Sequence, residues 1–430
     1  MPRQMKNSEI TWIGDIPEQW QLGRIGHLYS ERREKVSDRD FAPLSVTMQG
    51  VVPQLSTAAK TDAHDDRKLV RKGDFAINSR SDRRGSCGVS PCDGSVSLIN
   101  TILSPHDDMD AGYYNWLFHT TMFADEYYKW GHGIVDDLWT TGWQDLKRIS
   151  IPIPSLEEQE RISDFLNQEC ANIDSVLEQT RISIEEYKKL KQSIISKVVT
   201  SGIRGERSVR DSGDKWVGVI PKEWRITQLR HCASVKSGIT LGKTYSDETE
   251  LKEMPYLRVA NVQDGYVDIS DMAVLAVTDD EIEKYRLHAG DVLMTEGGDR
   301  DKLGRGCVWD ARIDPCLHQN HIFAVKTNES LLNPYFLEYV TASKIGRTYF
   351  DVTAIKTTNL ACTSSSKVMA FVIPLPSLEE QAEIVAYLKE KCGAIDNLIS
   401  KKELVISELT NYKKSMIYEY VTGKKEVPQS

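Results

Sequence analysis

The sequence lacks the features of a membrane or secreted protein. No uncharged apolar run approaches roughly 18 residues, and residues 1–6 contain no apolar signal core. The eight cysteines include no Cys-x-x-Cys pair, so we expect reduced thiols and no disulfide framework. A hydrophobic content of 40% and a charged content of 27% are typical of a globular protein, here with about two to four domains. These properties predict a cytoplasmic protein with no membrane contact.

Motifs of common enzyme classes are also missing. Neither Gly-x-Ser-x-Gly nor His-Glu-x-x-His occurs. Gly238–Thr244 has one residue fewer between its glycines than a phosphate loop requires, which favours a turn or a DNA-backbone contact. Residues 333–336, Asn-Pro-Tyr-Phe, resemble the catalytic tetrapeptide of amino-methyltransferases. They lack its second proline and no glycine-rich S-adenosylmethionine fingerprint precedes them, so a helix N-terminus explains them better.

No metal site and no cofactor are expected. The cysteine and histidine spacings match no zinc pattern in the two places where ligands could be imagined, Cys87 with Cys92, and Cys307 or Cys316 with His318 and His321. No group of carboxylates has a nuclease-like spacing. Together these absences argue against an enzyme, with no catalytic residue to name.

The charge balance is unusual for a nucleic-acid-binding protein, because the formal net charge is −9. The charge is uneven, however. Between residues 67 and 84, seven basic residues stand against two acidic ones. The basic residues are Arg67, Lys68, Arg71, Lys72, Arg80, Arg83 and Arg84. If this chain binds DNA, it does so locally, and partner proteins supply part of the phosphate contact.

The chain repeats itself. Residues 151–159, Ile-Pro-Ile-Pro-Ser-Leu-Glu-Glu-Gln, return almost unchanged at 373–381, an offset of 222 that continues without a gap for about fifty residues. A second repeat relates Trp12–Trp20 to Trp216–Trp224 at an offset of 204. The chain is therefore expected to consist of two halves, each a globular region followed by a long apolar-striped segment.

The striped segments predict two long helices. Ser155 and Ser377 are good N-caps, with Glu158 and Glu380 in the capping-box position, and Gly202 and Gly423 suit the C-terminal ends. Apolar residues recur in steps of four and three, which is a heptad pattern. The expected seam comprises Leu166, Ile173, Leu177, Ile184, Ile194, Leu388, Ile395, Ile399, Ile406 and Met416.

Helices of about 45 residues cannot bury one narrow stripe against a small domain. The simplest arrangement is an antiparallel coiled coil of the two copies, which relates the halves by a pseudo-two-fold axis. Two independent helical hairpins, or separate dimerisation helices, are the alternative.

The globular regions are expected to mix short strands and short helices, giving an α+β (mixed) fold. Candidate strands are 75–77, 256–259, 291–294 and 322–325, and candidate helices are 113–130 and 335–343. Residues 72–78 parallel 289–295, and each stretch leads into a loop rich in Gly, Asp and Arg, at 79–88 and 296–306. Outside these anchors the two regions diverge. This pattern indicates two modules that read different targets from one scaffold.

These observations divide the chain into five parts. The expected parts are a first globular domain at 1–150, a first long helix at 151–204, a second globular domain at 205–372, a second long helix at 373–425 and a tail at 426–430.

The repeated Pro-x-Pro-Ser-Leu-Glu-Glu-Gln helix start, the Trp-x-Gly-x-Ile-Pro-x-x-Trp motif and the Gly-Asp-Val-Leu strand resemble the specificity (S) subunit of type I restriction–modification systems. The resemblance covers nearly the whole chain. It implies two DNA target recognition domains joined by an antiparallel coiled coil, each reading one half of a split site in double-stranded DNA. It also implies a complex with two modification (M) subunits, which bind S-adenosylmethionine and methylate adenine, and with restriction (R) subunits. The S subunit itself is expected to be non-catalytic.

Under this resemblance, DNA contacts are expected from Arg, Lys, Asn and Gln on the loops, because these side chains match base edges and phosphates. The candidates are Arg67, Lys68, Asn78, Arg80, Arg83, Arg84, Lys243, Arg258, Asn261, Gln263, Arg300, Lys302, Arg305, Gln319 and Asn320. The outward helix faces are candidate docking surfaces for M subunits, with Glu157, Glu158, Gln159, Glu185, Glu186 and their counterparts in the second copy, such as Glu379, Glu380 and Gln381. An ordinary solvated face explains them equally well.

Two other functions compete with this interpretation. A stand-alone DNA methyltransferase or nuclease with a fused recognition module requires catalytic motifs that are not found. An architectural coiled-coil protein without sequence preference fits poorly with two divergent modules on a repeated frame.

Overall fold

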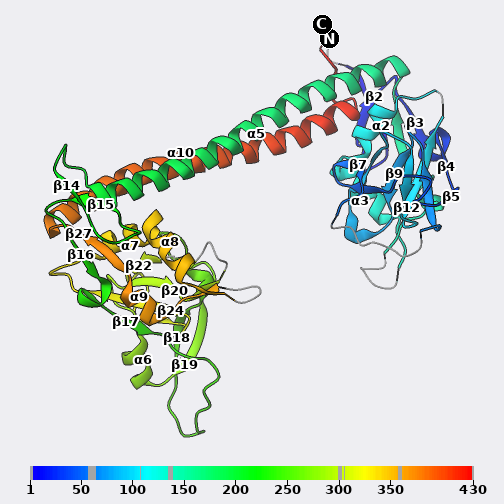
Figure 1. The fold of residues 1–430 in the computed structure, drawn as a ribbon. Coiled ribbons are helices and arrows are strands. Elements are labelled where there is room, and N and C mark those ends of the chain that lie inside the picture. The colour runs from blue at the N-terminus through cyan, green and yellow to red at the C-terminus, as the bar shows by residue number, and fades with distance from the viewer. Residues whose placement is uncertain are drawn as a thin grey trace. The chain divides into compact units, whose positions relative to one another are not determined.

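The computed structural model describes residues 3–56, 64–106, 108–133, 139–298, 303–304, 306–356 and 361–428. It contains two compact units. Unit 1 comprises Met1–Thr180 and Glu403–Ser430, and unit 2 comprises Arg181–Lys402. Helix α5 (Leu156–Ser201) and helix α10 (Leu378–Val421) each contribute one part to either unit (Figure 1).

Unit 1 builds a mixed region from short strands and helices. Its strands are β1 (Met5–Asn7), β2 (Asp15–Pro17), β3 (Gln21–Arg24), β4 (Tyr29–Glu31), β5 (Lys35–Val36), β6 (Leu44–Thr47), β7 (Gly50–Pro53), β8 (Arg67–Val70), β9 (Phe75–Asn78), β10 (Cys87–Val89), β11 (Gly94–Val96), β12 (Asn100–Pro105) and β13 (Ser150–Ile153). Its short helices are α1 (Ile25–Leu28), η1 (Ser81–Arg83), α2 (Ala111–Phe118), α3 (Thr121–Lys129) and α4 (Trp143–Leu146).

Unit 2 has a similar inventory. Its strands are β14 (Val209–Asp211), β15 (Val219–Pro221), β16 (Arg225–Gln228), β17 (Ala233–Ser237), β18 (Lys252–Leu257), β19 (Ala273–Val277), β20 (Val292–Thr295), β21 (Gly297–Gly298), β22 (Gly306–Val308), β23 (Leu317–His318), β24 (Ile322–Thr327), β25 (Ile355–Lys356), β26 (Ala361–Cys362) and β27 (Val372–Leu375). Its short helices are η3 (Leu229–His231), η4 (Val259–Asn261), α6 (Asp279–Tyr285), α7 (Pro334–Ala342), α8 (Lys344–Thr353) and α9 (Ser365–Ala370).

The two units share part of their topology. The four-stranded sheet of unit 1 has the order β10-β9-β12-β4, and that of unit 2 has the matching order β22-β20-β24-β17. The ribbon β1-β2 corresponds to β14-β15, and the strand that precedes each long helix pairs with an early strand of its unit, β13 with β3 and β27 with β16. The internal repeat therefore extends beyond the matching sequence motifs to the order of the strands.

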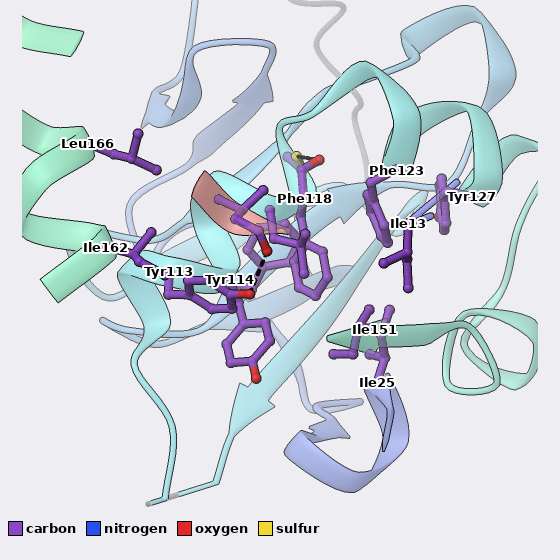
Figure 2. Close-up of a cluster of buried hydrophobic side chains, with 14 of the residues drawn as sticks. Ile13, Ile25, Tyr113, Tyr114, Phe118, Phe123, Tyr127, Ile151, Ile162 and Leu166 are labelled. Carbon is purple, nitrogen blue, oxygen red and sulfur yellow. Dashed lines mark hydrogen bonds between the residues drawn. The ribbon is translucent and has the colours of Figure 1, made fainter. Parts of the chain in front are cut away.

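The core of unit 1 is aromatic and reaches from the sheet to the long helices (Figure 2). The Phe118 ring lies 4.9 Å from Phe75 and 4.5 Å from Phe123, measured between centroids. The buried Tyr113 hydroxyl donates a hydrogen bond of 2.7 Å to the Val421 carbonyl of α10. Burial of several aromatic side chains, each worth about 2–3 kcal/mol, fastens the globular region to its helices.

The helices run antiparallel in each unit. In unit 1 the Phe165 and Tyr420 rings are 4.6 Å apart, and Lys413 Nζ lies 2.6 Å from Asp174 Oδ1. In unit 2 Lys191 Nζ lies 2.7 Å from Asp396 Oδ2. Because Asp174 and Lys191 become Asp396 and Lys413 when 222 is added, the two ion pairs are repeat counterparts of each other. Each unit therefore contains one copy of this ion pair.

The predicted seam residues are mostly at the helix interface, with local shifts. Seven of the ten are buried, namely Leu166, Ile173, Leu177, Ile184, Leu388, Ile395 and Met416. Ile194, Ile399 and Ile406 are half-buried, and the side chain buried near the end of α5 is Ile195. A straight α-helix drifts away from a strict seven-residue repeat, which accounts for a shift of one position.

One predicted helix is wrong in extent. The residues expected to form one helix at 113–130 belong to two helices, α2 and α3, because the chain leaves the helical conformation at Thr120. The Thr120 hydroxyl donates to the Leu117 carbonyl at 2.7 Å and accepts from the Phe123 amide at 3.2 Å, which makes it the N-cap of α3. The predicted N-cap Asn333 with Pro334 in the first turn of α7 is confirmed.

The long helices are not candidate membrane spans. Across the described residues, no helix combines the length and the apolar character needed to cross a bilayer.

Candidate nucleic-acid interface

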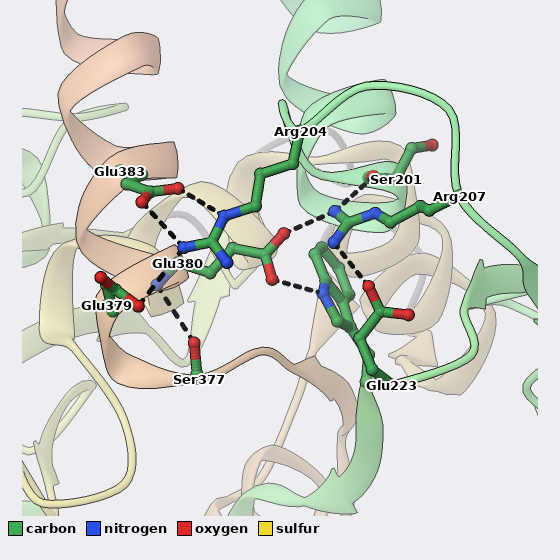
Figure 3. Close-up of polar contacts among 9 residues, drawn as sticks. Ser201, Arg204, Arg207, Glu223, Ser377, Glu379, Glu380 and Glu383 are labelled. Carbon is green, nitrogen blue, oxygen red and sulfur yellow. Dashed lines mark hydrogen bonds and ion pairs between the residues drawn. The ribbon is translucent and has the colours of Figure 1, made fainter.

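The start of each long helix is fixed by an anchor that repeats in both units. In unit 2 Glu380 accepts from Trp224 Nε1 at 2.9 Å and from Arg207 at 2.5 Å (Figure 3). In unit 1 Glu158 accepts from Trp20 Nε1 at 2.7 Å and from Arg3 at 2.5 Å. Each arginine also lies over its tryptophan ring, at 5.3 Å and 5.4 Å from the centroids.

The anchor corrects two predictions. Glu158 and Glu380 bind the tryptophans and arginines, and Glu380 meets the N-cap Ser377 only through its backbone amide. The glutamate side chains therefore do not complete a capping box. With 14% and 4% of their side chains exposed, Glu158 and Glu380 also cannot form an outward docking face.

The following glutamine completes the anchor. Gln159 donates to the Pro154 carbonyl at 2.9 Å and accepts from the amide of Asp110, the N-cap of α2. Gln381 repeats both bonds, with Pro376 and with Asn333, the N-cap of α7. Gln159 was expected on a docking face, but it is buried. Thus the repeated Glu-Glu-Gln motif sets the position of each globular region on its own helix segment.

Several predicted DNA contacts lie in the interior. The buried Arg67 donates to Ser95 Oγ at 2.9 Å and to the Ser95 carbonyl, and burial lowers the pKa of its guanidinium. Lys68 donates to the Asn100 carbonyl at 2.7 Å. The Asn261 side chain accepts from the Arg258 amide and donates to the carbonyls of Asp268 and Asp271. These side chains stabilise the fold, and Arg67 and Asn261 are removed from the proposed DNA contacts.

In unit 1 the loop after β9 keeps exposed arginines. Asn78 is buried at the end of β9, and its Oδ1 accepts from the Arg80 amide at 3.0 Å. Arg80, Arg83 and Arg84 are exposed. Arg84 pairs with Asp125 of α3 and lies 5.1 Å from the Tyr128 ring centroid, so it is held in place. The three arginines of this loop are therefore exposed, and one of them, Arg84, is held by contacts with α3.

Behind this loop lies a small pocket, and five of its fourteen lining residues are aromatic. Its lining includes Arg80 and Arg84 at the loop, and Phe118, Phe123, Tyr127, Tyr128 and Trp139. Phe118, Phe123 and Tyr127 are buried in the core, so only the half-buried Tyr128 and Trp139 rings lie beside the exposed guanidinium groups of Arg80 and Arg84.

In unit 2 the predicted residues are more dispersed. Lys243 pairs with Glu281 at 2.5 Å, and Arg258 pairs with Asp271 at 2.8 Å. Although burial alone would raise it, bonds from Lys243, Thr278 and Tyr245 lower the pKa of Glu281 to about 2. The Gln319 side chain accepts from the Val259 amide at 3.3 Å.

The remaining predicted residues of unit 2 have no common setting. Gln263 donates to the Ala260 carbonyl at 2.7 Å, and Asn320 is half-buried. Arg300, Lys302 and Arg305 lie outside the described residues.

No metal centre was found where the structure is described: no three His, Cys, Asp or Glu side chains are grouped to hold an ion. Cys87, Cys307, Cys316 and His318 are buried. Burial raises the pKa of the thiols of Cys87, Cys307 and Cys316 to about 12, which keeps them protonated.

Comparisons with known proteins agree with this geometry. The family model described as type I restriction modification DNA specificity domain matches residues 221–406. The chain is 26% identical to the putative MjaX specificity subunit of Methanocaldococcus jannaschii, over 48% of this chain and 47% of that protein. It is 24% identical to the MjaVIII specificity subunit of the same organism, over 95% and 93% of the two chains.

Residues 221–406 match a type I restriction–modification DNA specificity domain, and the similarity to a specificity subunit extends over 95% of the chain.

Other family members match to different extents. The chain is 24% identical to the Escherichia coli EcoKI specificity subunit over 64% of this chain and 58% of that subunit. Across these relatives, the aligned part therefore spans about half of the MjaX and EcoKI subunits and nearly all of the MjaVIII subunit. A chain solved in work on complex assembly and conformational transition of a type I system superimposes with a TM-score of 0.72, 16% identity and coverage of 95% and 99%. The crystal structure of the HsdS subunit from Thermoanaerobacter tengcongensis superimposes with a TM-score of 0.51 at 17% identity. The match covers 95% of this chain and 98% of that subunit. These two likenesses show the fold.

Sequence reasoning missed two members of the anchor. Arg3 and Arg207 differ by 204, the offset that relates the two tryptophan motifs, so the signal was present. It was overlooked because one matching arginine outside the motif does not indicate a contact unless its partner glutamate is known.

The units also differ in the interior behind matching strands. At β10 the Val89 amide donates to Asn115 of α2 at 3.2 Å, and at β22 the Val308 amide donates to Glu338 of α7 at 2.9 Å. Burial raises the pKa of Glu338 to about 7. The backbone amide donor is thus the same in both units, but its acceptor is the side-chain amide of Asn115 in unit 1 and the carboxyl of Glu338 in unit 2.

Proposed function

We propose that this chain is the DNA-reading, non-catalytic subunit of a type I restriction–modification complex and that each globular region reads one half of a split DNA site. The observation that carries the proposal is the repeated topology on antiparallel helices, combined with loops that differ between the units. The matching frame fixes how each module is held, and the differing loops allow two different sequences to be read.

Base readout in unit 1 is assigned to the loop after β9. Arg80, Arg83 and Arg84 are exposed there, and a guanidinium that forks onto guanine O6 and N7 gives about 1–3 kcal/mol of discrimination. In unit 2 the corresponding loop follows β20. Lys243, Arg258 and Gln263 are retained as weaker candidates because the first two are engaged in ion pairs.

Two M subunits are proposed to dock on the outer faces of the helices. Exposed apolar side chains occur there as repeat counterparts: Val176 with Leu398, Ile182 with Leu404, and Leu190 with Tyr412. One member of each pair lies in unit 1 and the other lies in unit 2, so each unit carries an equivalent set of three exposed apolar side chains. Two equivalent sets of exposed apolar side chains indicate two copies of one helical partner. R subunits are expected to join through this M–S complex.

Exchanging one recognition region tests the function. A chimaera in which residues 1–150 come from another family member, co-expressed with the cognate M subunit, is expected to methylate a split motif in which one half is new and the other is unchanged. A genome-wide map of methylated adenines reads both halves. A contiguous motif, a change in both halves, or methylation by the purified chain without an M subunit would contradict the proposal.

A further inference from the structure

We propose that unit 2 carries a second DNA contact, a lysine groove that binds backbone phosphates beside the half-site read by that unit. The proposal rests on the function proposed above. The groove is lined by Lys189, Gln192, Ser193, Ser196, Lys197, Lys344 and Arg347, which come from α5 and from the first turn of α8.

The floor of the groove is built by hydrogen bonds between these helices. Gln192 Nε2 donates to the Ala342 carbonyl at 2.7 Å, and the Lys344 amide donates to Ser196 Oγ at 2.9 Å. Arg347 Nε also donates to the Ala342 carbonyl, at 3.0 Å. The end of α7 and the start of α8 are therefore tied to α5, and the basic side chains project from a fixed surface.

Three lysines of the groove are available for an anion. Lys189, Lys197 and Lys344 are exposed, and among the described residues no carboxylate lies within ion-pair distance of them. The neighbouring cations are already used, because Arg347 pairs with Asp264 at 2.7 Å and Lys191 pairs with Asp396. In a chain with a net charge of −9, unpaired lysines around one groove concentrate positive potential there.

The sequence repeat supplies an internal comparison. Residues 181–201 contain five basic and two acidic residues, whereas their counterparts 403–423 contain two basic and three acidic residues. Lys189 and Lys197 correspond to Asn411 and Glu419, and Glu419 pairs with Lys425 at 2.7 Å. Since the buried framework is repeated and these lysines are not, pairing of the helices does not require them. They serve something specific to unit 2.

The position of the groove favours DNA as its occupant. Helix α8 begins with Lys344 at the groove, and further along it Phe350 packs against Gly304, where an added Cβ would lie 2.4 Å from the ring. Gly304 belongs to the Gly/Asp/Arg-rich loop 296–306 predicted to contact DNA. Helix α8 thus contacts Gly304 of that loop and also lines the lysine groove.

The experiment measures the salt dependence of DNA binding by the M–S complex. Lys189→Gln/Lys197→Gln/Lys344→Gln is compared with Lys222→Gln/Lys284→Gln/Lys326→Gln, which removes the same charge from exposed lysines elsewhere in unit 2. Each lost phosphate contact lowers the slope of log K against log salt by about 0.9. The groove variant should therefore lose about two to three units of slope on cognate and unrelated DNA alike, and its methylated motif should not change.

Different outcomes separate the possible failures. A slope equal to that of the control variant overturns the groove proposal while sequence-specific binding stands. Loss of M subunits from the groove variant without a change in slope also overturns it, because the groove would then be a protein contact. An unaltered M–S complex that shows no preference for cognate DNA overturns the proposed function itself.

Discussion

Replacing Glu380 with alanine is expected to lower the free energy of unfolding of unit 2 by about 3–5 kcal/mol. The carboxylate is nearly fully buried and accepts from both Arg207 and Trp224, and only 15% of the Arg207 side chain is exposed. Its removal leaves a partly buried guanidinium and an indole NH without that acceptor, which costs more than the loss of an exposed ion pair. Hydrogen exchange resolved by peptide should show the loss of protection in unit 2.

The repeat provides a matched partner and a control for this result. Glu158→Ala should produce the same loss in unit 1, because Arg3 and Trp20 occupy the equivalent places. Glu157→Ala removes an exposed carboxylate next to the anchor and should change stability by less than about 0.5 kcal/mol. Equal effects of Glu157→Ala and Glu158→Ala would show that the anchor does not hold the globular region to its helix.

Charged substitutions in the exposed apolar set of one unit are expected to remove one M subunit. Val176 and Tyr412 lie within two residues of the ion-paired Asp174 and Lys413 in unit 1, and their counterparts Leu398 and Leu190 lie equally near Asp396 and Lys191 in unit 2. Val176→Glu/Tyr412→Glu should leave a complex with one M subunit, because a carboxylate buried at a helix interface carries a large desolvation cost. Leu190→Glu/Leu398→Glu should do the same, and all four changes should abolish assembly. Mass photometry counts the subunits.

The fold of the free chain should survive these changes, since all four side chains are exposed. Circular dichroism with unchanged helix content and an unchanged melting temperature is the control. Retention of two M subunits by the four-fold variant would mean that the partner docks elsewhere.

Much of the architecture could be predicted because the repeated residues carry strong local signals. The seam spacing, the proline-bounded helix starts and the Asn333-Pro334 cap are physical signals that act within a few turns. Pairing of the two copies followed from the need to bury two long stripes, whereas the antiparallel direction was a separate hypothesis. The counterpart ion pairs Lys191–Asp396 and Lys413–Asp174 now show that direction in each unit.

The site was harder to predict because burial depends on distant partners. Arg67 belongs to a run of basic residues that looks exposed in sequence, yet it faces Ser95 of β11 across the β8–β11 pairing. Glu158 looked like a helix cap, but its partner Trp20 lies 138 residues away. A local pattern specifies which residue types stand together along a helix. It does not specify which long-range contact uses them.

The central claim is that the two long helices pair in an antiparallel direction and carry two different DNA-recognition regions. Zero-length carbodiimide cross-linking of the native monomer tests this claim most directly. This reagent joins a lysine to a carboxylate that it touches, so no substitution is needed. Peptide mass spectrometry should detect Lys191 joined to Asp396 and Lys413 joined to Asp174 within one chain. Pairing in the same direction and register would place Lys191 beside Lys413. Absence of both cross-links from the monomer would contradict the account.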